Sequence, residues 1–184
     1  MTSQNLRSVL AAGVCTAALV GGTVTAEAKE QPLQVGTLAS EYVQLRAEHS
    51  GKCLDIIADT MEEGPFAVQS ECTVGEDSQK FSFSEEYSFV RVQAKHSGRC
   101  LSTGPDFKWK AGQRWCWENS TNNADWRVVM VKIAGGFYEL RPRIALDYCL
   151  SVEDGSMKDN ASVNVSRCAG LANQHWQFQP IKEA

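Results

Sequence analysis

The stretch "VQLRAEHSGKCL" at residues 43–54 recurs as "VRVQAKHSGRCL" at residues 90–101, a shift of 47 residues. A further shift of 49 residues carries Cys100 onto Cys149, within the third and looser copy "YELRPRIALDYCLSV" at residues 138–152. Each copy continues with a polar loop, a short segment ending in cysteine, a second loop and an aromatic closing segment. The closing segments are "QKFSF" from Gln79, "ADWRVV" from Ala124 and "NQHWQF" from Asn173. This period predicts three similar units that bury their apolar faces against one another.

The pattern inside each unit has a period of two residues. Val43, Leu45 and Ala47 alternate with polar side chains, as expected for a strand with one buried face. The Ser-Gly pairs of "HSGK" and "HSGR", and the later pair Gly135-Gly136, predict tight hairpin turns. The segment after residue 28 never keeps a helical period for three turns. We therefore predict an all-β fold with about twelve short strands.

The N-terminus is typical of a secretory signal peptide. Arg7 precedes an apolar stretch from Ser8 to Val20, and small residues follow it. The stretch is shorter than the ~20 residues that a membrane-spanning helix needs. We predict a signal peptide at residues 1–28, with cleavage after Ala26 or Ala28, a leader at 29–40 and one domain at 41–184. The short charged region and the alanine-rich core favour a bacterial exporter.

Composition excludes two classes of partner. The net charge is -4 and the chain has no run of basic residues, so it offers no electrostatic surface for nucleic acid or anionic lipid. No later segment is apolar enough for membrane insertion. We therefore expect a secreted protein that binds neither nucleic acid nor a bilayer.

The cysteines predict disulfides. Cys15 lies in the predicted signal peptide, and an even number remains in an exported chain. Separations of 19, 16 and 19 residues alternate with gaps of 28 and 33, which favours sequential pairing. The predicted bonds are Cys53–Cys72, Cys100–Cys116 and Cys149–Cys168, each contributing ~3 kcal/mol by chain entropy. Since the chain has no Cys-x-x-Cys pair and its three histidines are scattered, we expect no metal site and no cofactor.

Three units of Cys-Leu-x, Cys and Gln-x-aromatic, in register over residues 41–180, resemble the ricin B-type β-trefoil lectin family. The resemblance implies a β-trefoil of three repeats that binds carbohydrate. It also implies that Phe81, Trp126 and Trp176 fill the core where the units meet. In sugar-binding members, an Asp after the first cysteine accepts hydrogen bonds from sugar hydroxyls, and an aromatic ring before the second cysteine covers the pyranose. An Asn-Gln pair beside the closing strand completes the site.

No unit carries this full set. The first keeps Asp55 and Gln79 but has Ser70 or Glu71 at the aromatic position; the second has Ser102 for the acid. The third keeps an Asn-Gln pair but has Ser151 for the acid and Ser166 for the aromatic ring, with Glu153 or Asp154 in the next turn as replacement acids. The predicted carbohydrate-binding residues are Asp55, Gln69, Gln79, Asn164, Asn173 and Gln174, and Trp115 is a candidate aromatic platform shifted by one residue.

Each candidate also has a purely structural interpretation. Asp55 can cap a turn, Asn173 and Gln174 can tie a loop to the backbone, and Trp115 can pack in a loop. The chain lacks a Gly-x-Ser-x-Gly elbow, a His-Glu-x-x-His motif and a phosphate loop, so we expect no enzymatic activity. Two functions remain open. One is a lectin for glycans or polysaccharide, and the other is a trefoil that binds a secreted or cell-surface protein, such as a protease inhibitor or a toxin's targeting subunit.

Overall fold

The computed structural model describes residues 42–57, 63–64, 67–117 and 123–181. The predicted signal peptide and leader lie outside these residues. No helix in the described ranges is long and apolar enough to cross a membrane.

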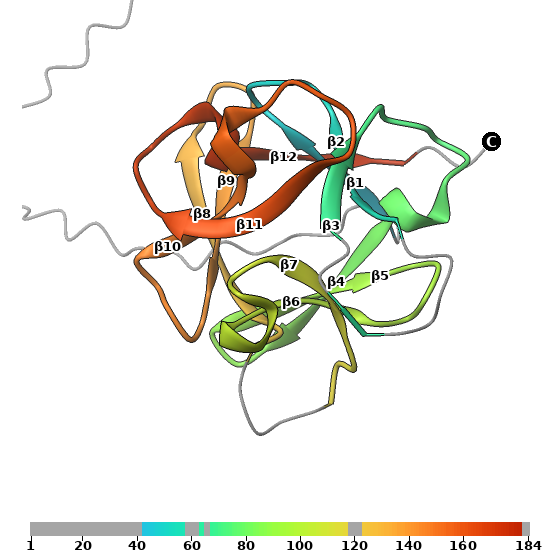
Figure 1. Ribbon diagram of the computed structural model, residues 1–184, viewed down its shortest axis with the longest axis vertical. Helices are drawn as coiled ribbons and strands as arrows, with labels where there is room; N and C mark the ends of the chain where they lie inside the picture. The colour runs from blue at the N-terminus through green and yellow to red at the C-terminus, as the bar shows by residue number, and fades with distance from the viewer. Residues whose placement is uncertain (1–41, 58–62, 65–66, 118–122, 182–184) are drawn as a thin grey trace, which may run out of the picture. The chain divides into compact units, whose positions relative to one another are not determined.

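The fold is all-β, as predicted, and the twelve strands of the described residues fall into three units of four (Figure 1). The first unit contains β1 (Val43–Ala47), β2 (Cys53–Ile56), β3 (Ala67–Ser70) and β4 (Phe81–Glu86). The second contains β5 (Phe89–Ala94), β6 (Cys100–Thr103), β7 (Ala111–Arg114) and β8 (Asp125–Lys132). The third contains β9 (Phe137–Pro142), β10 (Tyr148–Val152), β11 (Ala161–Arg167) and β12 (Trp176–Pro180). Short 3-10 helices lie at η1 (Asp77–Gln79), η2 (Pro105–Phe107), η3 (Glu153–Gly155) and η4 (Ala172–Gln174).

The first and fourth strands of the units form a closed ring. β1 pairs with β4 and β12, β5 with β4 and β8, and β9 with β8 and β12, all antiparallel. A closed ring leaves none of its strands at an edge. The hairpins β2–β3, β6–β7 and β10–β11 are the second and third strands of each unit. This arrangement is the predicted β-trefoil.

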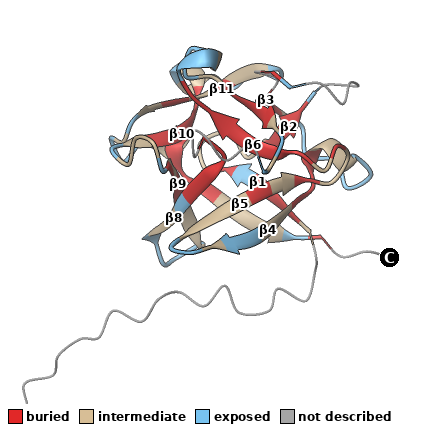
Figure 2. Ribbon diagram, turned by 90° about the horizontal axis from the view of Figure 1, so that it is seen from below, coloured by how far each residue is buried: buried red, intermediate tan, exposed pale blue. Residues whose placement is uncertain are grey.

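The three closing aromatic residues lie in the core, as the resemblance implies. Phe81, Trp126 and Trp176 have no exposed surface. Each indole also places its N–H: Trp126 donates to the carbonyl oxygen of Leu101 across 2.8 Å, and Trp176 to that of Leu150 across 3.0 Å. Figure 2 shows buried residues along most of β2, β6 and β10, where the hairpins face this core.

The predicted turns and disulfides are confirmed. Gly51 and Gly98 have φ values of +69° and +64°, a left-handed conformation that favours glycine. The three sequential disulfides are present, with Cα–Cα distances of 5.0, 5.0 and 5.1 Å. Each one joins the start of a unit's second strand to the segment just after its third strand. The unit-by-unit pairing follows because these two segments are hydrogen-bonded neighbours.

Candidate functional site

The hairpin register makes the three candidate sites directly comparable. Asp55 lies opposite Val68 in the first unit, Ser102 opposite Gly112 in the second, and Ser151 opposite Asn164 in the third. Side chains paired in this way point to the same face of a hairpin. Asp55, Ser102 and Ser151 therefore occupy equivalent positions, and Asn164 stands where the other units have Val or Gly.

A pocket of about 510 Å³ opens on this face of the third unit. Its floor comes from β10 and β11, one side from η3 and the other from the segment that contains η4. The first unit adds a residue from the turn after β1. The lining residues are His49, Ser151, Asp154, Gly155, Asn164, Ser166, Leu171, Ala172 and Asn173.

The pocket is rich in unsatisfied hydrogen-bond acceptors. Asn164 Oδ1 and His49 Nδ1 are buried and have no hydrogen-bond partner among the described residues. The side chain of Asp154 also lines the pocket, where it is exposed to solvent, and its backbone has φ of +54°. A buried acceptor without a donor costs about 1–3 kcal/mol, so Asn164 Oδ1 and His49 Nδ1 favour a ligand that brings hydrogen-bond donors.

Asn173 has its nitrogen fixed by the protein. Its Nδ2 donates to Ser151 Oγ across 3.1 Å and to the carbonyl oxygen of Val152 across 2.8 Å. These bonds tie the segment containing η4 to β10, so both the structural and the binding interpretation of Asn173 are compatible with its position. Beside it, Leu171 is 55% exposed and, with Ala172, gives the pocket an apolar edge, while Ser166 stands at the position of the family's aromatic ring.

Gln79 and Gln174 make the same clamp in two units. Gln79 donates from Nε2 to the carbonyl oxygen of Glu71 and accepts at Oε1 from the amide of Thr73, while Gln174 does so with Arg167 and Ala169. In both units the two clamped residues flank the second cysteine. Both glutamines are buried, so their amides hold the backbone around the disulfide and do not line the pocket.

Gln69 is also turned into the protein. It has no exposed surface, and its Nε2 donates to the carbonyl oxygens of Ser156 and Lys158 across 2.6 and 2.8 Å. Its Oε1 accepts from Ser50 Oγ across 2.8 Å. The side chain thus connects the turn after β1 to the loop that follows η3. Both segments are next in sequence to residues that line the third-unit pocket.

The first unit presents a partly unsatisfied acid. Asp55 is 8% exposed, and its Oδ2 accepts from Gln79 Nε2 across 3.1 Å. Its Oδ1 is buried without a partner in the described chain. Part of the loop between β2 and β3 lies outside the described residues, so only this carboxylate and its support are defined.

The second unit differs from the family pattern. Arg114 stands at the aromatic position, 4.7 Å from the ring centre of Phe107 and 3.5 Å from the carboxylate of Asp106. Trp115 lies beyond the end of β7, with its ring 4.0 Å from the Arg99 guanidinium and 4.9 Å from the ring of Trp117. One face of Trp115 is therefore covered by Arg99, and the indole packs against the β5–β6 turn.

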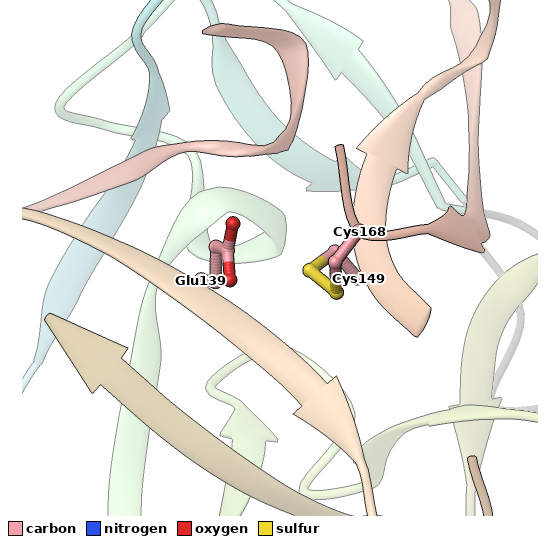
Figure 3. Close-up of side chains that lie close together, drawn as sticks. All are labelled: Glu139, Cys149 and Cys168. Carbon is pink, nitrogen blue, oxygen red and sulfur yellow. A yellow bond between two sulfur atoms is a disulfide. The ribbon is translucent and has the colours of Figure 1, made fainter. Parts of the chain in front are cut away.

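Glu139, Cys149 and Cys168 lie close together, with possible ligand atoms within 4.8 Å of one another (Figure 3). The two cysteines are joined in a disulfide, and thiolates rather than disulfide sulfurs bind metals. Arg141 donates to the buried Glu139 carboxylate across 2.6 Å. This cluster is therefore explained by an ion pair packed beside a disulfide.

The sequence did not indicate that His49 belongs to the third-unit pocket. The Ser-Gly pairs that follow His49 and His96 predict hairpin turns, and nothing in these turns predicts a contact with another unit. The contact depends on which units become neighbours when the ring of strands closes, and no local pattern encodes that. The repeat of "HSG" at residues 49–51 and 96–98 is the sequence signal that could indicate a shared role for this histidine, because equivalent turns of a repeat protein lie next to equivalent parts of a neighbouring unit.

Comparison with known proteins agrees with this geometry. The profile of the family described as ricin-type beta-trefoil lectin domain-like matches residues 29–112 and 77–166, which together span residues 29–166. No curated protein matches the chain significantly. The designed three-fold symmetric protein ThreeFoil is 27% identical, with a TM-score of 0.66 over 76% of this chain and 98% of the design.

Two natural structures share the fold at lower identity. The C-terminal half of an earthworm R-type lectin, solved with GalNAc, is 13% identical with a TM-score of 0.61 and is covered over 98% of its length by 76% of this chain. A GlcNAcα1-4Gal-releasing endo-β-galactosidase from Clostridium perfringens is 15% identical with a TM-score of 0.63, and 77% of this chain covers 32% of that enzyme. The repeats, the closed ring of strands and the matched profile lead to one conclusion: the chain belongs to the ricin-type β-trefoil lectin family.

Proposed function

We propose that this protein is a secreted, non-enzymatic lectin that binds neutral glycans in the third-unit pocket. The observation that carries the proposal is a pair of buried acceptors without donors, Asn164 Oδ1 and His49 Nδ1, in a pocket that is also lined by the exposed side chain of Asp154. Neighbouring hydroxyls of a pyranose supply several donors, and the apolar edge at Leu171 suits the C–H face of the ring.

The charge of the pocket favours neutral sugars over acidic ones. Among the described residues that line the pocket, Asp154 is the only one with an acidic side chain, and none is a lysine or an arginine. A uronate or sialate would bring a second negative charge into the same partly enclosed space, where repulsion is stronger than in water. GalNAc, the ligand in the earthworm lectin structure, is neutral and is a suitable first probe.

The first unit provides a second, weaker candidate site. The unpartnered Oδ1 of Asp55 is a side-chain acceptor at the position equivalent to Ser151. Two weak sites on one chain raise the apparent affinity for a polysaccharide through avidity, without new contacts. This argument favours repeated or clustered glycans as the biological ligand.

The disulfides and the predicted signal peptide support an extracellular role. Three disulfides are consistent with an oxidising compartment, and the predicted signal peptide, with its alanine-rich core, points to a bacterial exporter. The trefoil also occurs as one part of the larger galactosidase. In this chain we assign the domain a binding role alone.

The proposal is tested by a glycan array on the purified oxidised protein, run beside Asn173→Ala. The matched control is Asn123→Ala, at the equivalent position of the second unit. We expect binding to neutral glycans that falls at least about tenfold in the first variant and is unchanged in the control. Absence of binding by the wild-type protein to every neutral glycan would refute the proposal.

A protein-binding role is the second candidate function. It is favoured by Trp115 and Trp117, which are 37% and 63% exposed and whose tilted rings lie 4.9 Å apart beside the second disulfide. Exposed tryptophans with a nearby arginine are common at the centres of protein interfaces. Loss of a protein partner, but not of glycan, on Trp117→Ala would support this role.

A further inference from the structure

His49 reaches the third-unit pocket from a different unit of the fold. It lies in the turn after β1, and its ring lines the pocket beside residues of β10, β11 and η3. Its Nε2 lies 3.0 Å from the carbonyl oxygen of Ser156, in the loop after η3. The pocket is thus a composite of two units that are more than 100 residues apart in sequence.

This contact fixes which nitrogen carries the proton. A carbonyl oxygen can only accept a hydrogen bond, so Nε2 must be the donor and must be protonated. In the neutral ring, Nδ1 is then an acceptor with a free lone pair. That Nδ1 is the atom that is buried and has no partner in the described ranges.

Several contacts hold the turn and the loop in fixed relation. Gln69 bonds both Ser50 and Ser156, and its own carbonyl oxygen accepts from the amide of Asn160 across 2.8 Å. Lys52 pairs with Asp159 across 2.9 Å and also with Glu71. A wall held at this many points presents Nδ1 in one position, which lowers the entropic cost of binding.

The third unit also lacks the acid that the family uses at this face, since Ser151 replaces it. We propose that His49, supplied by the first unit, replaces that missing acceptor by taking a hydrogen bond at Nδ1 from a ligand hydroxyl. This inference rests on the proposed function and adds to it a specificity-determining residue from another repeat. It predicts that ligands lose affinity when the hydroxyl facing His49 is removed or methylated.

Two substitutions separate the two ring nitrogens. His49→Gln places an amide N–H near Nε2 and keeps the bond to Ser156, but it has no acceptor at the Nδ1 position. His49→Asn places an acceptor near Nδ1 and loses the bond to Ser156. With GalNAc and the neutral glycans of the array at about pH 8, we expect binding about three- to tenfold weaker in His49→Gln and within about twofold of wild type in His49→Asn. Equal melting temperatures would show that both variants are folded.

The second readout is the tautomer itself. In the protein labelled with ¹⁵N at histidine, the signal missing from His49→Gln identifies this ring, and we expect the Nε2–H form before ligand is added and a shift of Nδ1 on adding GalNAc. A Nδ1–H form, or wild-type affinity in His49→Gln, overturns the inference.

If wild-type protein binds glycan and Asn173→Ala does not, while His49→Gln binds normally, only the role of His49 fails. If wild-type protein binds no neutral glycan, both proposals fail.

Discussion

Gln69 in the first unit donates a hydrogen bond of 2.6 Å to the carbonyl oxygen of Ser156 in the third unit. The residue equivalent to Gln69 in the second unit is Gln113, which accepts from Ser97 Oγ across 2.7 Å. The same side chain therefore anchors the turn of its own unit in two repeats. Only in the first unit does this anchor also support the described pocket.

We predict that Gln69→Leu and Gln113→Leu each lower the free energy of unfolding by about 2–4 kcal/mol. Each substitution removes a side-chain amide and leaves its buried hydrogen-bond partners unsatisfied. Only Gln69→Leu should also weaken glycan binding, since it releases the loop that follows η3, the short helix that contains Asp154. Chemical denaturation and calorimetric titration measure the two effects. Equal glycan affinity in both variants would show that Gln69 has no part in shaping the pocket.

Ser151→Asp should tighten glycan binding. The substitution restores the acid that Asp55 supplies at the equivalent position of the first unit, within reach of Asn173 Nδ2, 3.1 Å from the present hydroxyl. Charge-assisted hydrogen bonds are roughly twice as strong as neutral ones, so we expect affinity about three- to tenfold higher. Titration with GalNAc measures the change, and unchanged or weaker binding would place the sugar elsewhere.

Asp154→Asn should change selectivity. Removing the one formal charge of the pocket weakens an acceptor, so affinity for neutral glycans should fall by about three- to tenfold. The same change removes the repulsion that excludes uronates, so the ratio of neutral to acidic binding should fall further. An array that carries matched glucosides and glucuronides tests both effects. A wild-type protein that prefers glucuronides would contradict the electrostatic argument.

His96 should make stability depend on pH. Burial lowers the pKa of its imidazole, and the carboxylates of Asp55 and Asp77 oppose this shift. Below the unfolded pKa of 6.5, the unfolded chain binds more protons at this position than the folded chain does. The free energy of unfolding is therefore highest above about pH 6.5 and decreases as the pH falls toward the folded pKa. Both ring nitrogens lack partners in the described chain, so His96→Phe should fold and should flatten this dependence.

The Glu48 carboxyl also makes the free energy of unfolding depend on pH, but in a more acidic range. The hydrogen bond from Lys132 lowers the pKa of the Glu48 carboxyl, so its contribution is lost only below the unfolded value of 4.5. The difference between the wild-type protein and His96→Phe in denaturation curves between about pH 7.5 and 5 therefore reports on His96. An unchanged slope in His96→Phe would contradict the assignment.

The sequence predicted the fold well because its signals are local and repeated. Two-residue alternation placed Leu45 in the core, the Ser-Gly turns set the hairpins, and the spacing of the cysteines matched neighbouring strands. The closing aromatics followed from the same register, since Trp126 and Trp176 occupy one equivalent position. Each of these features is determined within a single unit.

The candidate site was predicted only in part. Asn164, Asn173 and the replacement acid Asp154 do meet in one pocket. Gln174 does not line it, because its amide is used by the backbone around Cys168. Resemblance gives the position of a residue but not the partners that its side chain finds. His49 was missed because its neighbours belong to another unit.

The most direct test of the third-unit pocket is a titration of the ¹⁵N-labelled protein with GalNAc, or with the best neutral glycan of the array, followed by amide chemical shifts. We predict that the largest shifts fall on Ser151, Asn164 and Asn173, with smaller ones at the turn of His49. Shifts confined to Trp115 and Trp117, or none at saturating sugar, would contradict the account.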